Sequence, residues 1–307
     1  MSLTDDQCAN FVLEQLIAYK RPLAAIKAAA HYLHKLSGRT ELSSDLLAKI
    51  LELAAIEPND CEIIPDLIGY SISEVIKTLQ SGNTIERERM RRIEWMYLSV
   101  LRDEDPRPIN LLKEIDENPQ FFAKLICFIV KANPPIEDEF LDISPELRSQ
   151  YAENSWHLLN LVDQLPGQRG QEIDVNYLEK WINIVRKECS NKNRCELGDS
   201  YIGELLSHSP IGSDGVWPHE SVRHIVELIE NHEIERGIKT GLYSGRGSIS
   251  RSVREGGKQE RDLSNMYREY VNKLRHKWPR TAAMLISISE EFYHEGSMED
   301  TWSELMY

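Results

Sequence analysis

TIERERMRRIEWMYLSVLR, the stretch from residue 84 to residue 102, decides the fold class. Its apolar side chains recur at i, i+3, i+4, i+7 and i+8, the spacing of one helical face: Ile93, Met96, Tyr97, Val100 and Leu101. Its first half is a run of Glu and Arg side chains, and such pairs three or four positions apart are typical of a solvated helix face. The stretch therefore predicts one helix over about 84–102 with a single buried side.

The helical period extends over most of the chain, and strict strand alternation is scarce. The period recurs in two later segments, at Leu178, Trp181, Ile182 and Val185 and at Leu263, Tyr267, Tyr270 and Leu274. Prolines and capping residues divide the chain into helices at about 4–20, 22–36, 44–55, 65–80, 119–131 and 145–163, with others after Pro218 and Pro279. Short connections favour antiparallel neighbours. We predict an all-α fold, an irregular array of antiparallel helical hairpins of α-solenoid or HEAT-like type without a fixed repeat period.

Two polar stretches interrupt this helical pattern. Residues 132–145 hold three prolines and four acidic residues, which predicts a surface loop. Residues 164–175 hold two glycines and a proline and predict a domain boundary. The expected division is an N-terminal helical array over 1–163 and a C-terminal helical region over 176–307.

Charge and composition exclude several classes of protein. The 307 residues include 36 basic and 50 acidic side chains, a net charge of −14, which argues against a nucleic-acid coat or an anionic membrane-surface binder. The longest apolar run, 125–130, is far too short to span a bilayer, and the acidic start lacks the features of a signal peptide. The cysteines are odd in number and scattered, which favours the reducing cytoplasm: Cys8, Cys61, Cys127, Cys189 and Cys195.

The segment 236–261 departs from this acidic background. It holds seven basic and two acidic side chains, a net charge of +5, which leaves −19 on the rest of the chain. It also holds six of the 16 glycines and four serines. Glycine permits close backbone approach and arginine matches phosphate or carboxylate, so the segment could form an anion-binding loop. The simpler interpretation is a loop whose arginines pair with acidic helices around it and join two helical halves.

Candidate contact residues follow from this segment and from a Trp-Pro-His motif upstream of it. They are Tyr243, Arg246, Arg251, Arg254 and Arg261, with Trp217 and His219 nearby in sequence. A dinucleotide fingerprint is absent, because Ser250 stands where the third glycine would fall, and the chain contains no Walker loop. The tryptophans Trp95, Trp156, Trp181, Trp217 and Trp278 are predicted to pack in the core.

No metal, cofactor or catalytic set emerges from the remaining motifs. His219 and His224 are five residues apart and diverge around a helix, so they do not form a zinc-protease pair. His31 and His34 lack further ligands, and the Cys189–Cys195 pair lacks a second pair. Since no hydrolase or protease motif is complete, we predict no metal and no cofactor, and whether the chain is an enzyme stays open.

Several strings resemble the C-terminal helical region of large, mostly uncharacterised bacterial proteins, some of them defence-associated. They lie at 93–98 (IEWMYL), 118–122 (NPQFF), 214–220 (DGVWPHE), 241–247 (GLYSGRG), 255–261 (EGGKQER) and 278–282 (WPRTA). The resemblance covers nearly the whole chain and implies that it is the tail of a longer polypeptide. It implies no catalytic residue.

Three functional hypotheses remain at this point. The first is a non-enzymatic helical scaffold or sensor that contacts a protein partner or other domains of a larger bacterial protein. The second is nucleotide or nucleic-acid binding through the Arg-rich loop 241–261, with the steep salt dependence of counterion release. The third is a hydrolase assembled from Glu, His and Arg residues that are distant in sequence.

Overall fold

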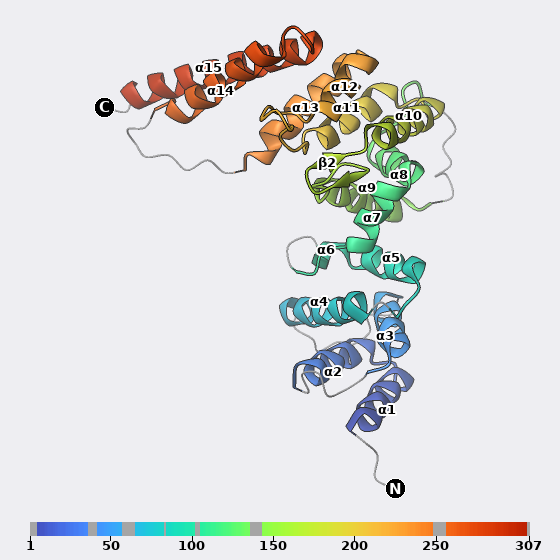
Figure 1. The fold of residues 1–307 in the computed structure, drawn as a ribbon. Helices are drawn as coiled ribbons and strands as arrows, with labels where there is room; N and C mark the ends of the chain where they lie inside the picture. The colour runs from blue at the N-terminus through green and yellow to red at the C-terminus, as the bar shows by residue number, and fades with distance from the viewer. Residues whose placement is uncertain are drawn as a thin grey trace. The chain divides into compact units, whose positions relative to one another are not determined.

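The computed structural model describes residues 5–35, 42–56, 65–82, 84–101, 105–135, 143–247 and 256–305. Within these ranges the chain forms helices α1 to α15 and a two-stranded sheet of two residues per strand (Figure 1). The all-α prediction is confirmed. The chain divides into two compact units, Met1–Glu114 with Ser149–Leu161 and Ile115–Arg148 with Val162–Tyr307. Residues 115–148 thus belong to the second unit, which differs from the expected division between 1–163 and 176–307.

The first unit is built from short helices around an aliphatic core. Its elements are α1 (Asp5–Ala18), α2 (Pro22–Lys35), α3 (Ser44–Ile56), α4 (Pro65–Gly82), α5 (Arg87–Met96), α6 (Leu98–Leu101) and most of α7 (Ile109–Glu117) and α9 (Pro145–Asn160). Helix α2 packs against α1, α3 and α4. The core gathers side chains from helices α1 to α6, among them Leu13, Ile26, Leu47, Leu51, Ile76 and Ile93. The finer prediction of a solenoid-like stack stays a prediction.

The single helix expected over about 84–102 is two helices with a break at Tyr97. Ile93, Tyr97 and Leu101 are buried as predicted, whereas Met96 is 40% exposed. The Tyr97 hydroxyl donates a hydrogen bond of 2.7 Å to the Leu51 carbonyl, which holds this residue against α3 at the turn between α5 and α6. The break therefore coincides with a tertiary contact to a residue 46 positions away.

The second unit holds the longer helices. Its elements are α8 (Pro119–Ile129), β1 (Gln168–Arg169), β2 (Glu172–Ile173), α10 (Val175–Asn191), α11 (Cys195–Leu206), α12 (Glu220–Ile229), α13 (His232–Gly245), α14 (Lys258–Leu274) and α15 (Pro279–Leu305). The strands pair antiparallel within the stretch 164–175, with Gln168 opposite Ile173 and Gly170 at positive φ in the turn. Helix α8 belongs to this unit because it packs on α10, where the Phe122 and Trp181 rings lie 4.9 Å apart.

Local sequence signals set most helix starts. Helices α4, α8, α9 and α15 begin at the prolines that predict them. The Asn118 side chain caps α8 by accepting from Phe121 N, and Asp174 and Asn231 cap α10 and α13 in the same way.

The prediction of core packing for the tryptophans is wrong at Trp156, which is 51% exposed, and holds at Trp181 and Trp217, which are buried.

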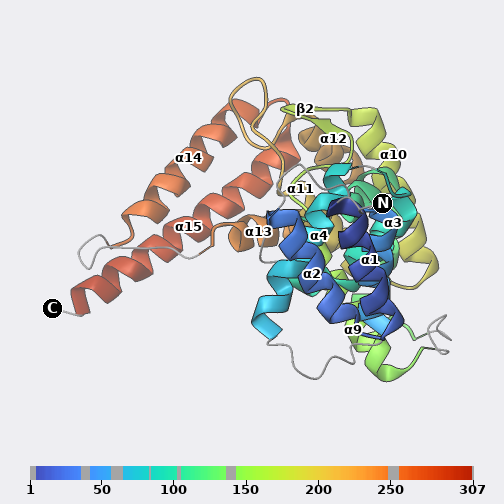
Figure 2. The same ribbon diagram turned by 90° about the horizontal axis from the view of Figure 1, so that it is seen from below.

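Glycines of the segment 236–261 serve helix packing. A Cβ atom on Gly237 would lie 2.0 Å from the Ser200 carbonyl oxygen, and one on Gly203 would lie 2.1 Å from the Ile234 carbonyl oxygen. The backbones of α11 and α13, which run parallel, therefore touch. A Cβ atom on Gly257 would lie 2.0 Å from the Gly296 carbonyl oxygen, where α14 and α15 form an antiparallel hairpin. Both ribbon views show α14 and α15 side by side (Figures 1 and 2).

Candidate functional site

Arg246 contacts the α14–α15 hairpin instead of facing solvent. Its guanidinium group donates hydrogen bonds to Glu260 at 3.1 Å and Glu295 at 3.3 Å, and lies 4.6 Å from the centre of the Phe292 ring. Glu260 is fully buried, so its charge requires a partner. The sequence predicts Arg246 as a contact residue, and the structure places it in an ion pair inside the second unit.

Tyr243 and Arg261 take part in the same packing. The Tyr243 ring tilts against Phe292 at 5.0 Å, and burial followed by the nearby Glu291 carboxylate raises the pKa of its hydroxyl. Arg261 pairs with Asp300, which also accepts a hydrogen bond of 2.9 Å from the backbone of Gly257. The structure brings these two residues and Arg246 together on the α14–α15 hairpin. Arg251 and Arg254 lie outside the described residues.

Trp217 and His219 belong to a compact loop between α11 and α12. The Trp217 indole donates to the Ser209 carbonyl at 2.9 Å, and the His219 backbone donates to the Ser209 hydroxyl at 2.8 Å. The His219 ring accepts from Ser221 N at 3.1 Å and so caps α12. Both side chains are buried. Trp217 and His219 therefore hold the loop together. The Trp217 ring also contacts the Tyr267 ring, which stacks on Phe292 beneath Arg246.

A buried arginine holds this loop in place. Arg223 of α12 has no exposed side-chain surface and forms a bidentate pair with Asp214 at 2.6 and 2.8 Å. It also donates to the carbonyls of Pro218 and Val216. The hydrogen bond from Arg223 is the main cause that lowers the pKa of Asp214. The guanidinium group thus supplies hydrogen-bond donors to the carbonyls of a loop that has no regular secondary structure of its own.

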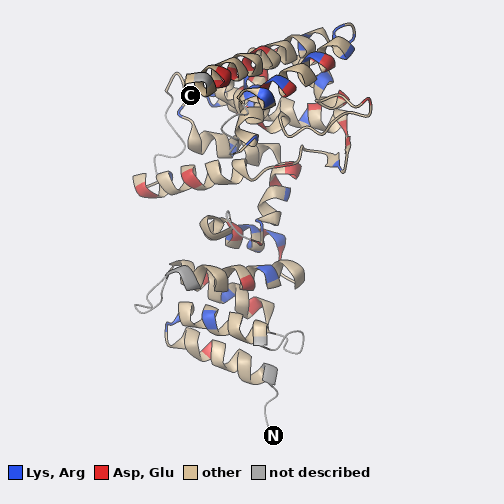
Figure 3. Ribbon diagram, turned by 90° about the vertical axis from the view of Figure 1, so that its left-hand side faces the viewer, with Lys and Arg blue, Asp and Glu red and all other residues tan. Residues whose placement is uncertain are grey.

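The remaining described cations of the segment 236–261 also lie near carboxylates, with the exception of the exposed Lys258. Arg236 pairs with Glu233 at 2.5 Å, and Lys239 pairs with Glu291 at 2.5 Å. Basic and acidic residues alternate along the helices of the second unit (Figure 3). The described cations of this segment are therefore largely balanced by carboxylates that lie on α14, on α15 or within one helical turn.

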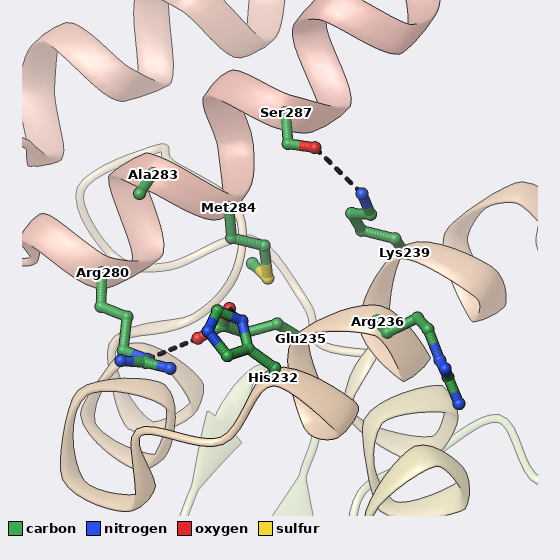
Figure 4. Close-up of a pocket in the computed structure, with 8 residues that line it drawn as sticks. All are labelled: His232, Glu235, Arg236, Lys239, Arg280, Ala283, Met284 and Ser287. Atoms are coloured by element: carbon green, nitrogen blue, oxygen red, sulfur yellow. Dashed lines mark hydrogen bonds and ion pairs between the residues drawn. The ribbon is translucent and has the colours of Figure 1, made fainter.

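A groove of about 440 Å³ lies between α13 and α15. We call it the α13–α15 groove, and its lining residues are His232, Glu235, Arg236, Lys239, Arg280, Ala283, Met284 and Ser287. Two contacts cross it: Arg280 Nε donates to Glu235 at 2.5 Å, and Lys239 Nζ donates to the Ser287 hydroxyl at 2.9 Å (Figure 4). The Met284 side chain points from α15 toward α13 between these contacts (Figure 4).

The groove is formed by two helices with fixed positions. Helix α13 is pressed onto α11 through Gly237 and Gly203, on the face opposite to Glu235 and Lys239. The first turn of α15 is held by Glu227 of α12, which accepts from the Thr281 backbone at 2.8 Å and the Arg280 backbone at 3.2 Å. The groove is therefore preformed in this unit.

Catalytic and metal-binding chemistry finds little support in the residues that the structure describes. His219 lies 3.5 Å from Glu220, but its other ring nitrogen caps α12, so the imidazole is engaged on both sides. Burial raises the pKa of the Cys189 thiol to about 12, which makes it a poor nucleophile. The described ranges contain no group of three side chains arranged to hold a metal ion. Among the same ranges, no helix combines the length and apolarity needed to cross a bilayer.

Sequence reasoning missed the residues of the α13–α15 groove. The sequence does show that the residues of each wall share one helix face, because both sets follow the spacing i, i+3, i+4, i+7. The sets are His232, Glu235, Arg236 and Lys239, and Arg280, Ala283, Met284 and Ser287. The alignment of these two stripes could not be found in the same way, because 48 residues separate Lys239 from its partner Ser287.

Comparison of the chain with protein-family models, with curated proteins and with solved structures finds no match.

Proposed function

We propose that this chain is a non-enzymatic helical protein-interaction module, and that the α13–α15 groove is its contact site. The observation that carries the proposal is the combination of a preformed groove, an apolar floor at Met284, which is 4% exposed, and unused hydrogen-bond donors on the rim. Grooves of this kind bind a partner through an apolar anchor and orient it through a few polar groups.

The rest of the proposal follows the expectations from sequence. We propose that the module belongs to a larger bacterial protein in the cytoplasm, as scaffold or sensor. The resemblance of strings such as DGVWPHE to the C-terminal regions of large bacterial proteins supports the first part. Among the described residues, the thiols of Cys8, Cys189 and Cys195 form no disulfide, which supports a reducing compartment.

The alternative, nucleotide or nucleic-acid binding through 241–261, receives less support. Arg246 and Arg261 direct their guanidinium groups at Glu260, Glu295 and Asp300. A polyanion would have to displace these carboxylates from arginines that hold two helices together. We therefore place the partner contact in the groove, on the face of α13 that carries Lys239.

Selection of random peptides from a display library tests the proposal. The wild-type chain is compared with Ala283→Trp, which fills the groove at an exposed helix position without removing a charge. Ser297→Trp is the matched control, because Ser297 is exposed on the same helix and bonds only to its own helix carbonyl. We expect peptides that bind the wild type and the control but lose binding to Ala283→Trp. Enrichment of no peptide, or equal binding to both Trp variants, would reject the groove as a contact site.

A further inference from the structure

We infer that the turn between α14 and α15 is a second contact surface of this chain, and that it binds a short acidic segment of a partner protein. Four exposed side chains form the surface, which we call the basic turn: Lys273, Arg275, His276 and Lys277. None of them lines the α13–α15 groove, so the inference goes beyond the proposed function. It rests on positive charge that no described carboxylate compensates.

The basic turn lies in a stretch of sequence without acidic residues. Residues 270–289 contain four lysines and arginines and no Asp or Glu, although the chain has 50 acidic residues among 307. Cations in this stretch therefore have no carboxylate within a helical turn on either side, in contrast to Arg236, which pairs with Glu233 on α13. Any compensating charge must come from another helix.

The carboxylates that other helices bring to the start of α15 bind groups outside the basic turn. Glu235 of α13 pairs with Arg280, and Glu227 of α12 accepts from the backbone N–H groups of Arg280 and Thr281. Within the described ranges, no cation of the basic turn lies at ion-pair distance from a carboxylate. The turn thus keeps three full positive charges.

The basic turn covers the solvent-facing arc at the end of α14. Leu274 is buried and marks the side that faces the core. Because successive helical residues are rotated by about 100°, Arg275, His276 and Lys273 follow one another around the remaining arc, with Lys277 beside Lys273. Arg275 is the C-cap of α14 and keeps helical backbone angles, so this order holds to the end of the helix. A ligand that approaches from solvent meets these side chains together.

The end of α14 accounts for only a part of this charge. A helix C-terminus carries about half a negative elementary charge and favours nearby cations. The Leu274 carbonyl at this end already accepts from the backbone N–H groups of Lys277 and Trp278. The Lys277 ammonium group lies 5.1 Å from the centre of the Trp278 ring, a contact that neutralises no charge. Most of the positive charge therefore stays available to a ligand.

The surroundings of the turn favour a short acidic peptide over a polynucleotide. Two exposed carboxylates border it: Glu269, one turn earlier on α14, and Glu230, three residues beyond the Glu227 that holds the start of α15. A nucleic acid carries closely spaced phosphates along its whole length, so it would extend over these carboxylates and over a chain of net charge −14. A short segment with a few Asp or Glu side chains contacts the cations of the turn alone.

Fluorescence anisotropy with a labelled peptide of alternating Glu and Ser tests the inference on the full chain. At low salt we expect the wild type to bind this peptide, and replacement of its Glu by Gln to weaken binding about tenfold, the combined effect of several exposed ion pairs. Added salt should weaken binding of the Glu peptide, because exposed charges are screened. Absence of binding at low salt, or equal binding of the Gln peptide, would overturn the inference.

Variants of the basic turn locate the binding. The triple replacement of Lys273, Arg275 and Lys277 by Ala should weaken the Glu peptide about tenfold. Circular dichroism checks its fold. The single variants Lys273→Ala and Lys277→Ala, each expected to weaken binding about twofold, keep the test valid if the triple variant loses helicity. Unchanged binding in all of these variants would overturn the inference.

A matched control separates the basic turn from net charge. It replaces three exposed lysines elsewhere in the second unit by Ala: Lys124, Lys180 and Lys187. The net charge changes equally, and we expect this control to bind the Glu peptide as the wild type does. Equal losses in the two triple variants would overturn the inference. Loss of binding in Ala283→Trp would also overturn it, since the peptide would then lie in the groove.

A labelled oligothymidylate of similar length tests the competing class of partner. We expect the wild type to bind it more weakly than the Glu peptide at the same salt concentration, because its phosphates meet the bordering carboxylates. Tighter binding of the oligothymidylate, lost in the triple variant of the basic turn, would replace the acidic peptide by a nucleic acid as the ligand of this surface.

Discussion

Arg246, the residue that caps the C-terminus of α13, donates a hydrogen bond of 3.1 Å to Glu260 of α14, a carboxylate with no solvent exposure. The same guanidinium group lies over the Phe292 ring of α15, so one side chain joins three helices. The sequence segment with the largest excess of basic residues thus contributes a buried ion pair to the fold. Burial of one partner without the other would be costly, because an isolated charge loses its hydration.

Arg246→Ala is expected to lower the free energy of unfolding by about 3 kcal/mol, because Glu260 would lose a charged partner in a buried site. Urea denaturation followed by circular dichroism measures this. Arg268→Ala is the control, since Arg268 is exposed and contacts only the Tyr293 ring at 5.5 Å, and it should cost less than about 1 kcal/mol. Equal effects of the two substitutions would contradict a structural role for Arg246.

A single methyl group on α13 is expected to separate two helices. Gly237→Ala places a Cβ atom 2.0 Å from the Ser200 carbonyl oxygen, so α11 and α13 must move apart at a cost of about 1–3 kcal/mol. Gly245→Ala is the matched control, because nothing lies within 4 Å of its Cβ position and alanine favours helices. In thermal unfolding, Gly237→Ala should lower the melting temperature clearly, whereas Gly245→Ala should not lower it. A stable Gly237→Ala protein would show that these backbones do not touch.

Glu94 is expected to make stability depend on pH in the first unit. Burial raises the pKa of this carboxyl above its ordinary value of 4.5, although Asn110, Gln80 and the Leu111 backbone donate hydrogen bonds to it. The folded protein therefore keeps the proton to higher pH than the unfolded chain does, and stability falls as pH rises from 4.5 through the raised pKa. Urea titrations of the wild type and Glu94→Gln over this range measure the effect. In Glu94→Gln the free energy of unfolding should depend less on pH over this range. Parallel curves for the variant and the wild type would show that Glu94 does not cause the dependence.

The loop between α11 and α12 is expected to depend on Arg223. Arg223→Ala removes a fully buried guanidinium group with four hydrogen bonds, to Asp214 and to two loop carbonyls, and should cost about 3 kcal/mol or more. Arg236→Ala is the comparison, since its exposed pair with Glu233 should contribute less than about 0.5 kcal/mol. Urea unfolding curves of the two variants measure these costs. If Arg223→Ala lowered the free energy of unfolding no more than Arg236→Ala does, the loop would be held by other contacts.

Helix starts and buried helix faces could be predicted from the sequence, because the residues that determine them lie within a few helical turns of one another. The starts of α8 and α15 follow from Pro119 and Pro279, and the buried face of α10 follows from Leu178, Trp181 and their neighbours. The break at Tyr97 could not be predicted, since it involves the carbonyl of Leu51 in another helix. The tertiary partner, and not the local period, sets the turn there.

The candidate site illustrates the same limit. Glycine and arginine in 236–261 are equally compatible with an anion-binding loop and with helix packing, and the choice depends on partners far along the chain. Gly203 and Gly296 meet the glycines, and Glu260 and Glu295 meet Arg246. The α13–α15 groove needs two stripes from separate helices, and the sequence contains both without showing that they face each other.

Helix α13 packs against two helices on opposite sides. Its Gly237 and Gly241 contact α11, whereas Lys239, Tyr243 and the capping residue Arg246 contact α15. Insertion or deletion of one residue between these positions would turn the downstream part of the helix by about 100° and misalign both sides together. Point changes along α13 can be compensated singly, but its length cannot change by one residue. Natural variants of this chain should therefore differ between 232 and 246 in residue type and agree in residue number.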